Sequence, residues 1–376
     1  MNLFAALLST ALCMIFMTRV IEAGYPCKMV VIASVANLVD TPGFDNAPHR
    51  GFSFSRNVPH LQTQLLCNDQ VIALEEKVIC DQKWVKVQVQ EQKKVHFDDE
   101  KGLVISHYTG WMRARDLSLI FDNCNYRQDY IVSSLYKTMC IGESKVILPF
   151  GTKLHIGDEF IPGFCRAELI KNNGLVLSGK LDTLERDSFT QLPDLKNLTS
   201  DLLLQKELRD ATVHYARLFL GMPYVWGGCS PYLSHVNHLT GVDCSGLIYL
   251  CYRACGFELP RDAHDQFLAT YPVHPANLQP GDLVFFGAEH EQDGKKMVCI
   301  NHVLMYTDQE TLIEARGNQA YDNVDNMSDE ERAVLLVCET PFEERLGKPL
   351  SQFFNGEFFQ EKNVFVYFRT VFPLID

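Results

Sequence analysis

The pattern of apolar residues changes near residue 200, and this change constrains the fold more than any other feature of the sequence. Between about residues 60 and 190, short β-type runs follow one another closely and are separated by turns rich in Gly, Asn and Pro. The clearest runs are 71–74, 84–89, 103–105, 107–112 and 145–148. After residue 200, apolar residues recur at helical spacing instead. The sequence therefore predicts small all-β units first and an α+β unit afterwards.

Two helices followed by a sheet are expected in the second half. Apolar residues from Leu208 to Phe219 share one helical face, and Gly221-Met222-Pro223 ends that helix. A second helix fits Ser245 to Cys255, with Asp243 as its N-cap and Gly256 at its end. Strands are then expected at 283–286, 302–306, 311–315 and 365–370. This order of elements is typical of an α+β domain.

The length of 376 residues allows two to four domains at roughly 100–200 residues each. Residues 3–17 form an uncharged apolar run of signal-peptide length, and cleavage after Ala23 would follow it; a retained anchor is the alternative. We expect a signal peptide at 1–23, two small all-β barrels at 24–125 and 126–200, and the α+β domain at 201–376. No other segment approaches 18 uninterrupted apolar residues, so the mature chain is expected to contain no integral membrane segment.

Charge and cysteine usage exclude several classes of protein. Lys and Arg number 34 and Asp and Glu 47, which gives a net charge of −13 and argues against a nucleic-acid partner. Cys251 and Cys255 lie one helical turn apart and are best explained as core positions. Cys229 with His235 and His238 is only a faint metal-binding pattern, because a fourth ligand is missing. Neither a metal nor a cofactor is expected.

Cys244 is the candidate nucleophile. It lies in the sequence Gly-Val-Asp-Cys-Ser-Gly at residues 241–246, at the predicted start of the second helix. The thiolate is the reactive form of cysteine, and the partial positive charge at a helix N-terminus lowers the pKa of a thiol. The backbone N–H groups at the same helix start can also stabilise an oxyanion.

A nucleophilic thiol needs a base, and His302 is the best candidate because it opens a predicted strand directly after Asn301. If the hairpin 302–315 turns around Asp308, His302 and Glu314 lie opposite each other on one face. The carboxylate could then orient the imidazole. A register slip of one residue would place the two side chains on opposite faces, and the sequence alone does not fix the register.

Five ordered motifs resemble those of NlpC-type cell-wall cysteine peptidases. They are Gly-Met-Pro-Tyr-Val-Trp-Gly-Gly at 221–228, Asp-Cys-Ser-Gly at 243–246, Pro-Arg-Asp at 260–262, Gln-Pro-Gly-Asp-Leu-Val-Phe-Phe at 279–286 and Asn-His-Val at 301–303. The resemblance implies a papain-like fold in which Cys244 attacks an amide carbonyl and His302 acts as base and then as acid. The third catalytic position is commonly His in this family and is matched here by Glu314. A carboxylate can also orient the base, since triads with Asp or Glu recur on unrelated folds.

The resemblance also implies residues that bind substrate. Tyr224 matches an active-site tyrosine, with a role as a core aromatic as the alternative. Asp243 and Ser245 match positions that face the amine end of the substrate, although a simple helix cap explains Asp243 nearly as well.

The upstream barrels resemble bacterial SH3-like domains. Family members with two such domains resemble γ-D-glutamyl-L-diamino acid endopeptidases, which cut peptidoglycan stem peptides bearing a free N-terminal L-Ala. In those enzymes the first barrel holds the substrate amine with a tyrosine and an acidic residue. Tyr108 resembles that tyrosine. The motifs do not place the acidic residue, for which Asp69 is a candidate.

The sequence thus predicts an exported hydrolase of peptidoglycan stem peptides or muropeptides, located in the periplasm or cell envelope. Two alternatives come from other functional classes. One is a cell-wall-binding protein with a vestigial catalytic domain, and the other is an acyl transferase or amidase on the same fold.

Overall fold

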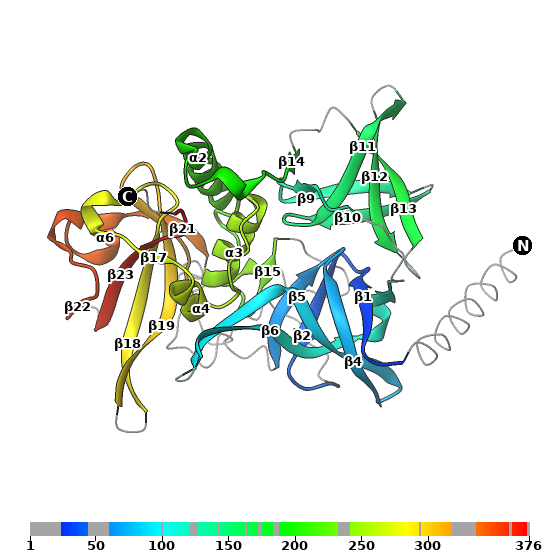
Figure 1. Ribbon diagram of the computed structural model, residues 1–376, viewed down its shortest axis with the longest axis horizontal. Helices are drawn as coiled ribbons and strands as arrows, with labels where there is room; N and C mark the ends of the chain where they lie inside the picture. The colour runs from blue at the N-terminus through cyan, green and yellow to red at the C-terminus, as the bar shows by residue number, and fades with distance from the viewer. Residues whose placement is uncertain are drawn as a thin grey trace, which may run out of the picture.

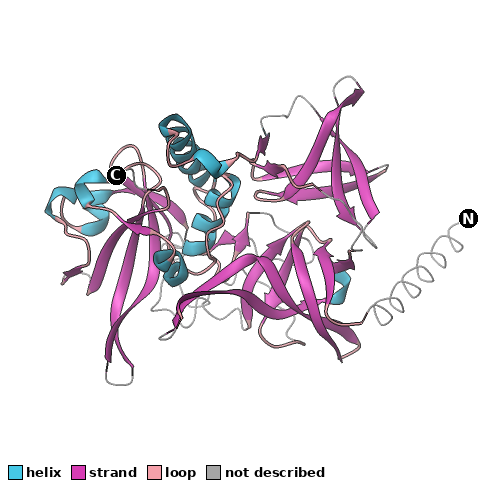
Figure 2. Ribbon diagram, in the orientation of Figure 1, coloured by secondary structure: helices cyan, strands magenta, loops and turns pink. Residues whose placement is uncertain are grey.

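The computed structural model describes residues 24–43, 60–98, 101–120, 127–141, 143–161, 164–171, 175–182, 188–231, 241–292, 295–317, 336–360 and 363–373. The signal peptide expected at 1–23 and the residues His235 and His238 lie outside these ranges. Three sheets dominate the described chain, and helices gather beside the C-terminal one (Figures 1 and 2). None of the helices in these ranges combines the length and the hydropathy of a membrane-spanning segment.

The first sheet has seven antiparallel strands in the order β3-β2-β6-β5-β4-β1-β7. The strands are β1 (Cys27–Val31), β2 (Val35–Val39), β3 (Leu61–Leu66), β4 (Gln70–Ile79), β5 (Gln82–Asp98), β6 (Gly102–Arg113) and β7 (Leu117–Leu119), with a 3-10 turn at Ala114–Asp116 before β7. The predicted runs 103–105 and 107–112 belong to one strand, β6, because its pairing with β5 continues through His107. That pairing is irregular between Gln88 and Lys93, opposite Tyr108.

The second sheet also has seven strands, in the order β10-β9-β13-β12-β11-β8-β14. They are β8 (Tyr130–Val132), β9 (Tyr136–Ile141), β10 (Ser144–Pro149), β11 (Lys153–Ile161), β12 (Phe164–Lys171), β13 (Leu175–Asp182) and β14 (Phe189–Gln191), followed by a 3-10 turn at Leu195–Asn197. Each upstream sheet has its own apolar core. Met29, Leu65 and Val87 belong to the first core, and Met139, Leu148 and Leu154 belong to the second.

The C-terminal region pairs helices with a third sheet of order β17-β23-β18-β19-β20-β21, to which β22 adds at β23. The helices are α2 (Leu202–Leu218), α3 (Cys244–Ala254), α4 (Ala263–Leu268) and α6 (Phe342–Leu346). The strands are β17 (Tyr271–Pro272), β18 (Leu283–Gln292), β19 (Lys295–Tyr306), β20 (Thr311–Ala315), β21 (Val337–Pro341), β22 (Glu357–Phe359) and β23 (Val364–Thr370). A two-stranded ribbon, β15 (Cys229–Ser230) with β16 (Gly241–Val242), precedes α3. Short 3-10 turns lie at Pro275–Asn277 and Leu350–Gln352.

The two predicted helices are confirmed, with shifted ends. The first begins at Leu202, earlier than its apolar pattern indicates, because the Asp201 side chain accepts a hydrogen bond from the Leu204 N–H at 2.9 Å and caps the helix. The second begins at Cys244 with Asp243 as its N-cap, as predicted. The strand expected at 302–306 extends back to Lys295, so His302 lies inside a strand and does not open it.

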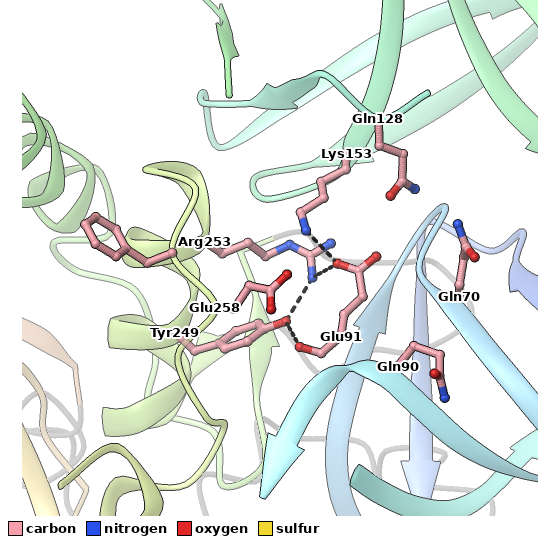
Figure 3. A pocket seen from close by; sticks show the side chains of 9 residues that line it. Gln70, Gln90, Glu91, Gln128, Lys153, Tyr249, Arg253 and Glu258 are labelled. Carbon is pink, nitrogen blue, oxygen red and sulfur yellow. Dashed lines mark hydrogen bonds and ion pairs between the residues drawn. The ribbon is translucent and has the colours of Figure 1, made fainter. Parts of the chain in front are cut away.

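Helix α3 lies between the C-terminal sheet and the upstream sheets, and every one of its residues is buried (Figure 1). At its far end Arg253 pairs at 2.5 Å with Asp69, in the turn between β3 and β4, and at 2.9 Å with Glu91 of β5. Lys153 of the second sheet pairs with the same Glu91 carboxylate at 2.9 Å (Figure 3). One guanidinium, whose side chain is 4% exposed, therefore joins α3 to the first sheet and, through Glu91, to the second.

We predict that Arg253→Met lowers the free energy of unfolding by about 3–5 kcal/mol, because it leaves two buried carboxylates without their shared cation. Urea unfolding of the purified protein measures this loss. The matched control is Lys196→Met, which removes a cation from an ion pair with Asp194 whose side chains are 85% and 70% exposed; we expect no measurable loss of stability. Equal losses in the two variants would contradict this account of the junction.

Candidate active site

Cys244 is the first residue of α3 and lies on the wall of a cavity of about 470 Å³. The Asp243 side chain fixes the first turn of the helix by accepting a hydrogen bond from the Gly246 N–H at 2.6 Å. The first N–H groups of the helix have no intrahelical partners, as at any helix N-terminus, and the cap satisfies only one of them. The thiol is thus held at the positive end of a helix dipole and faces a cavity.

The neighbouring cysteines are in a different environment. Cys251 and Cys255 are 0% and 2% exposed within the apolar core. Burial raises the pKa of the Cys255 thiol to about 12 and that of Cys251 well above its usual value. Both thiols are therefore protonated and inert, which confirms their prediction as core positions.

A β-bulge positions His302. Phe286 pairs with His302, and the next residue, Gly287, pairs with Ile300, so Asn301 is the extra residue in β19. Such bulges redirect side chains next to functional sites. Here the imidazole hydrogen-bonds both to the Cys244 thiol and, through Nε2 at 2.6 Å, to Oε2 of Glu314. Because Nε2 is bonded to Glu314, Nδ1 is the ring nitrogen left for the sulfur.

The hairpin that brings His302 and Glu314 together has a register different from the predicted one. Met305 pairs with Ile313 and Tyr306 with Leu312, so the turn is centred at 309 and not at Asp308. The pairing is displaced by two residues, which keeps both side chains on the same face but makes them diagonal neighbours. The expectation of directly opposite positions is wrong, whereas the expectation of a shared face is confirmed.

Glu314 is buried among cations, with a side chain that is 0% exposed. Arg316 donates to its Oε1 at 3.1 and 2.8 Å, and Arg345 donates to Oε1 at 2.5 Å and to Oε2 at 3.1 Å. Burial would raise the pKa of Glu314, but hydrogen bonds from His302 and Arg345 hold this pKa well below its usual range. The group is therefore a permanent anion beside the imidazole.

The protonated form of His302 is favoured in turn. Burial would lower the pKa of His302, but its hydrogen bonds to Cys244 and Glu314 outweigh burial and raise this pKa to about 9. At neutral pH the imidazole therefore holds a proton that it can share with, or return to, the thiol. A thiolate–imidazolium pair oriented by a carboxylate is the arrangement that nucleophilic catalysis by cysteine requires.

Asp243 and Ser245 lie on the cavity wall, and their polar groups bond to neighbouring protein groups. Arg261, which is 1% exposed, donates to Oδ1 of Asp243 at 2.9 Å and to Oδ2 at 2.7 Å. The same guanidinium donates to the Ser245 hydroxyl at 3.0 Å and to the Thr63 hydroxyl of the first sheet at 2.9 Å. The structure therefore places Asp243 primarily as a helix cap and as the partner of a buried arginine.

The same cavity brings together aromatic and charged groups from two sheets. Tyr224 lines it, and a Cβ built on Gly317 would lie only 2.5 Å from the Tyr224 ring, so this glycine allows the backbone to pack against the ring. From the first sheet, Tyr108 donates a hydrogen bond to Asp262. The Lys94 ammonium lies 4.1 Å from the centre of the Tyr108 ring.

Asp69 is not the acidic residue of this cavity, because it pairs with Arg253 and does not line the cavity wall. The acidic side chain beside Tyr108 is Asp262, which follows Arg261 in the Pro-Arg-Asp motif. That motif was a signal for both residues, although their roles could not be read from it. Lys94 and Arg345 carried no sequence signal, because each reaches the site from a distant segment.

The NlpC/P60 family profile matches residues 221–335. A gamma-D-glutamyl-L-lysine dipeptidyl-peptidase of Bacillus subtilis (strain 168) is 30% identical over 250 residues, which cover 65% of this chain and 69% of that protein. A protein of the same name from Bacillus cereus (strain ATCC 10987 / NRS 248) is 26% identical over 272 residues, covering 69% of this chain and 68% of its own length.

The fold is also similar to a solved structure. The crystal structure of an NlpC/P60 family protein from Bacillus cereus ATCC 10987 aligns with a TM-score of 0.61 and 21% identity, covering 92% of this chain and 100% of that one. The alignment extends far beyond residues 221–335, so the similarity includes the arrangement of the upstream sheets with the C-terminal domain.

We predict that the rate of Cys244 alkylation by iodoacetamide, plotted against pH, changes near pH 9, where His302 loses its proton. We call this change the upper step of the profile. In Glu314→Gln this step moves to lower pH, because the lost negative charge no longer stabilises the imidazolium. Mass spectrometry of the peptide containing Cys244, after reaction at a series of pH values, measures both profiles. An unshifted or upward-shifted step in the folded variant would refute the electrostatic role given to Glu314.

Proposed function

Because the chain belongs to the NlpC/P60 family, we propose that it is an endopeptidase that cuts the γ-D-glutamyl to diamino acid bond of peptidoglycan stem peptides bearing a free N-terminal L-Ala. The chain is a cysteine peptidase. The shared cavity is the observation that carries the finer proposal. Cys244 lines the same cavity as Tyr108 and Lys94 of the first sheet and Asp262 of the C-terminal domain. The names of the two Bacillus relatives support the same bond class.

The proposed reaction uses Cys244 of α3, His302 of β19 and Glu314 of β20. The Cys244 thiolate attacks the γ-carbonyl carbon of D-Glu, and the electron pair of the C=O bond moves onto oxygen. When the tetrahedral intermediate collapses, the C–N bond breaks and His302 gives its proton to the leaving amine of the diamino acid. The product of this step is a thioester on Cys244. His302, now neutral, takes a proton from a water molecule as the water oxygen attacks the thioester carbonyl carbon. Collapse of this second tetrahedral intermediate breaks the C–S bond, releases L-Ala-γ-D-Glu with a free γ-carboxyl group, and restores the thiolate of Cys244 beside the protonated His302.

The start of α3 provides electrostatic help at the carbonyl oxygen. The backbone N–H of Cys244 is among the helix-start donors that have no intrahelical partner. A donor fixed before the reaction stabilises the oxyanion without having to reorganise. We assign this N–H to the oxyanion site.

Two opposite charges beside Tyr108 define the amine end of the site. Asp262 is the anion for the L-Ala ammonium, since a cation withdrawn from water needs a paired anion. Within the described part of the chain, Lys94 is in no ion pair, and it faces the same cavity. The γ-linkage leaves the α-carboxylate of D-Glu free, one residue from the ammonium, and we assign Lys94 to that carboxylate.

Side chains of the first sheet line this end of the cavity, and we propose that they favour short, trimmed fragments over intact cross-linked polymer. We propose that both upstream sheets are SH3-like barrels and that the protein is exported to the cell envelope, where such fragments occur. The alternative of a vestigial catalytic domain is disfavoured by the intact contact between Cys244, His302 and Glu314.

Product analysis tests the proposal. We expect purified protein to convert L-Ala-γ-D-Glu-L-Lys, or the diaminopimelate equivalent, into L-Ala-γ-D-Glu and the free diamino acid, and Cys244→Ala to form no product. Liquid chromatography with mass spectrometry identifies the products. A transferase would instead require an added amine acceptor. Cleavage between L-Ala and D-Glu, or none in the wild-type protein, would overturn the assignment of the bond.

The amine end has its own control. N-acetylation of the substrate's L-Ala removes the ammonium, and Asp262→Asn removes its partner, so each is expected to lower kcat/KM by about 30-fold or more. With the acetylated substrate, wild type and Asp262→Asn should have similar kcat/KM values, because the interaction between the ammonium and Asp262 is already lost. Equal kcat/KM values for free and acetylated substrates in the wild-type enzyme would remove Asp262 and Tyr108 from substrate recognition.

A further inference from the structure

Three cationic groups surround the single carboxylate of the catalytic contact. His302 bonds to Oε2 of Glu314, Arg316 donates twice to Oε1, and Arg345 bridges both oxygens. Glu314 has a fully buried side chain, while the side chains of Arg316 and Arg345 are 30% and 20% exposed. Neither arginine lines the cavity that contains Cys244. Both arginines contact the catalytic groups through this carboxylate.

The catalytic cycle makes this arrangement necessary. His302 is a cation before the leaving amine departs and neutral while it activates water. A buried carboxylate with His302 as its only partner would be left as an unpaired charge in the neutral stage, which is strongly unfavourable away from water. Guanidinium groups stay protonated at any working pH, so Arg316 and Arg345 keep the anion paired throughout.

We propose that Arg345, supported by Arg316, is a positioning residue that fixes Glu314 as a permanent anion with one oxygen directed at Nε2 of His302. The bidentate contact of Arg345 with both carboxylate oxygens prevents the carboxylate from rotating away. The inference concerns the cysteine–histidine chemistry itself, so it holds whichever amide bond the enzyme cuts.

The segment that supplies Arg345 supports this role. Arg345 lies in α6, which begins after β21 and outside the residues 221–335 matched by the family profile. Its guanidinium also lies 5.2 Å from the centre of the Phe286 ring, and that ring lies 5.9 Å from the His302 ring. Arg345 therefore contacts both the partner of the imidazole and an aromatic ring packed beside it.

The charges around this cluster set the direction of the expected pH effect. His302 faces Cys244 from α3 and Glu314 from β20, while Glu314 faces the two arginines. Two further groups act on the arginines, namely the Cys338 thiol of β21 and the Glu344 carboxylate of α6. Removing the Arg345 cation makes the electrostatic potential at His302 more negative, because the charge of Glu314 is then less compensated. This change stabilises the imidazolium. The loss of the imidazole proton should therefore move to higher pH.

The test compares Arg345→Met and Arg345→Lys with the wild-type enzyme. For Arg345→Met we expect kcat to fall about 10- to 100-fold with KM within about twofold, because the orientation of the base is lost while substrate contacts remain. The upper step of Cys244 alkylation should move to higher pH, a readout that needs no substrate. Arg345→Lys keeps the positive charge, so its upper step should stay near that of the wild type. Lysine cannot donate to both carboxylate oxygens in the geometry of the guanidinium, so kcat should remain reduced.

The matched control is Arg217→Met. Arg217 pairs with Glu339 at 2.9 Å and with Asp308 at 2.7 Å near the turn of the same hairpin, with a side chain 31% exposed and no contact with Glu314. We expect its kcat and alkylation profile to match the wild type. An unshifted upper step and an unchanged kcat in folded Arg345→Met, or the same changes in Arg217→Met, would overturn the proposal. If Arg345→Met fails to fold, a wild-type kcat in Arg345→Lys overturns it instead.

Discussion

The buried ion pair between Asp243 and Arg261 holds the site together, since it fixes the helix turn that presents the nucleophile. Both oxygens of Asp243 accept from the guanidinium, and the same carboxylate accepts from the N–H groups of Gly227 and Gly246. Arg261 also donates to Thr63 of the first sheet. A buried pair of this kind adds little net stability, but breaking it is costly. It thereby fixes one geometry for the start of α3.

The same helix is anchored at both ends to the first sheet. Arg261 reaches Thr63 near the N-terminus of α3, and Arg253 reaches Asp69 and Glu91 near its C-terminus. These contacts set the distance between Cys244 and the side chains of the first sheet that line the cavity. The substrate-binding cavity therefore depends on two parts of the chain that are far apart in sequence, which explains why the upstream sheet contributes to the proposed specificity.

Much of the site could be predicted from local patterns. The helix start at Cys244 followed from its cap residue and apolar periodicity, and the shared face of His302 and Glu314 followed from the alternation of β-strands. The turn centre was missed by one residue, because hairpin register depends on the conformation of the loop, where Glu310 has a positive φ of 50°. The bulge at Asn301 left no trace that periodicity could detect.

Groups that reach the site through tertiary packing could not be predicted. Lys94 approaches from a strand some 150 residues before Cys244, and Arg345 from a five-residue helix after β21. Asp69 was misplaced for the same reason: its charge is used by Arg253 at the junction of the sheets. Charged residues are common in any sequence. Only the folded structure distinguishes an ion-pair partner of Glu314 from a solvated side chain.

The most direct measurement of the central claim is the intact mass of the enzyme quenched with acid within milliseconds of mixing with L-Ala-γ-D-Glu-L-Lys. The account predicts a transient adduct equal in mass to L-Ala-γ-D-Glu minus water, located on Cys244 by peptide mapping and absent from Cys244→Ala. Turnover by Cys244→Ala, or an adduct mapped to another residue, would contradict the claim that this thiol, served by His302, is the nucleophile.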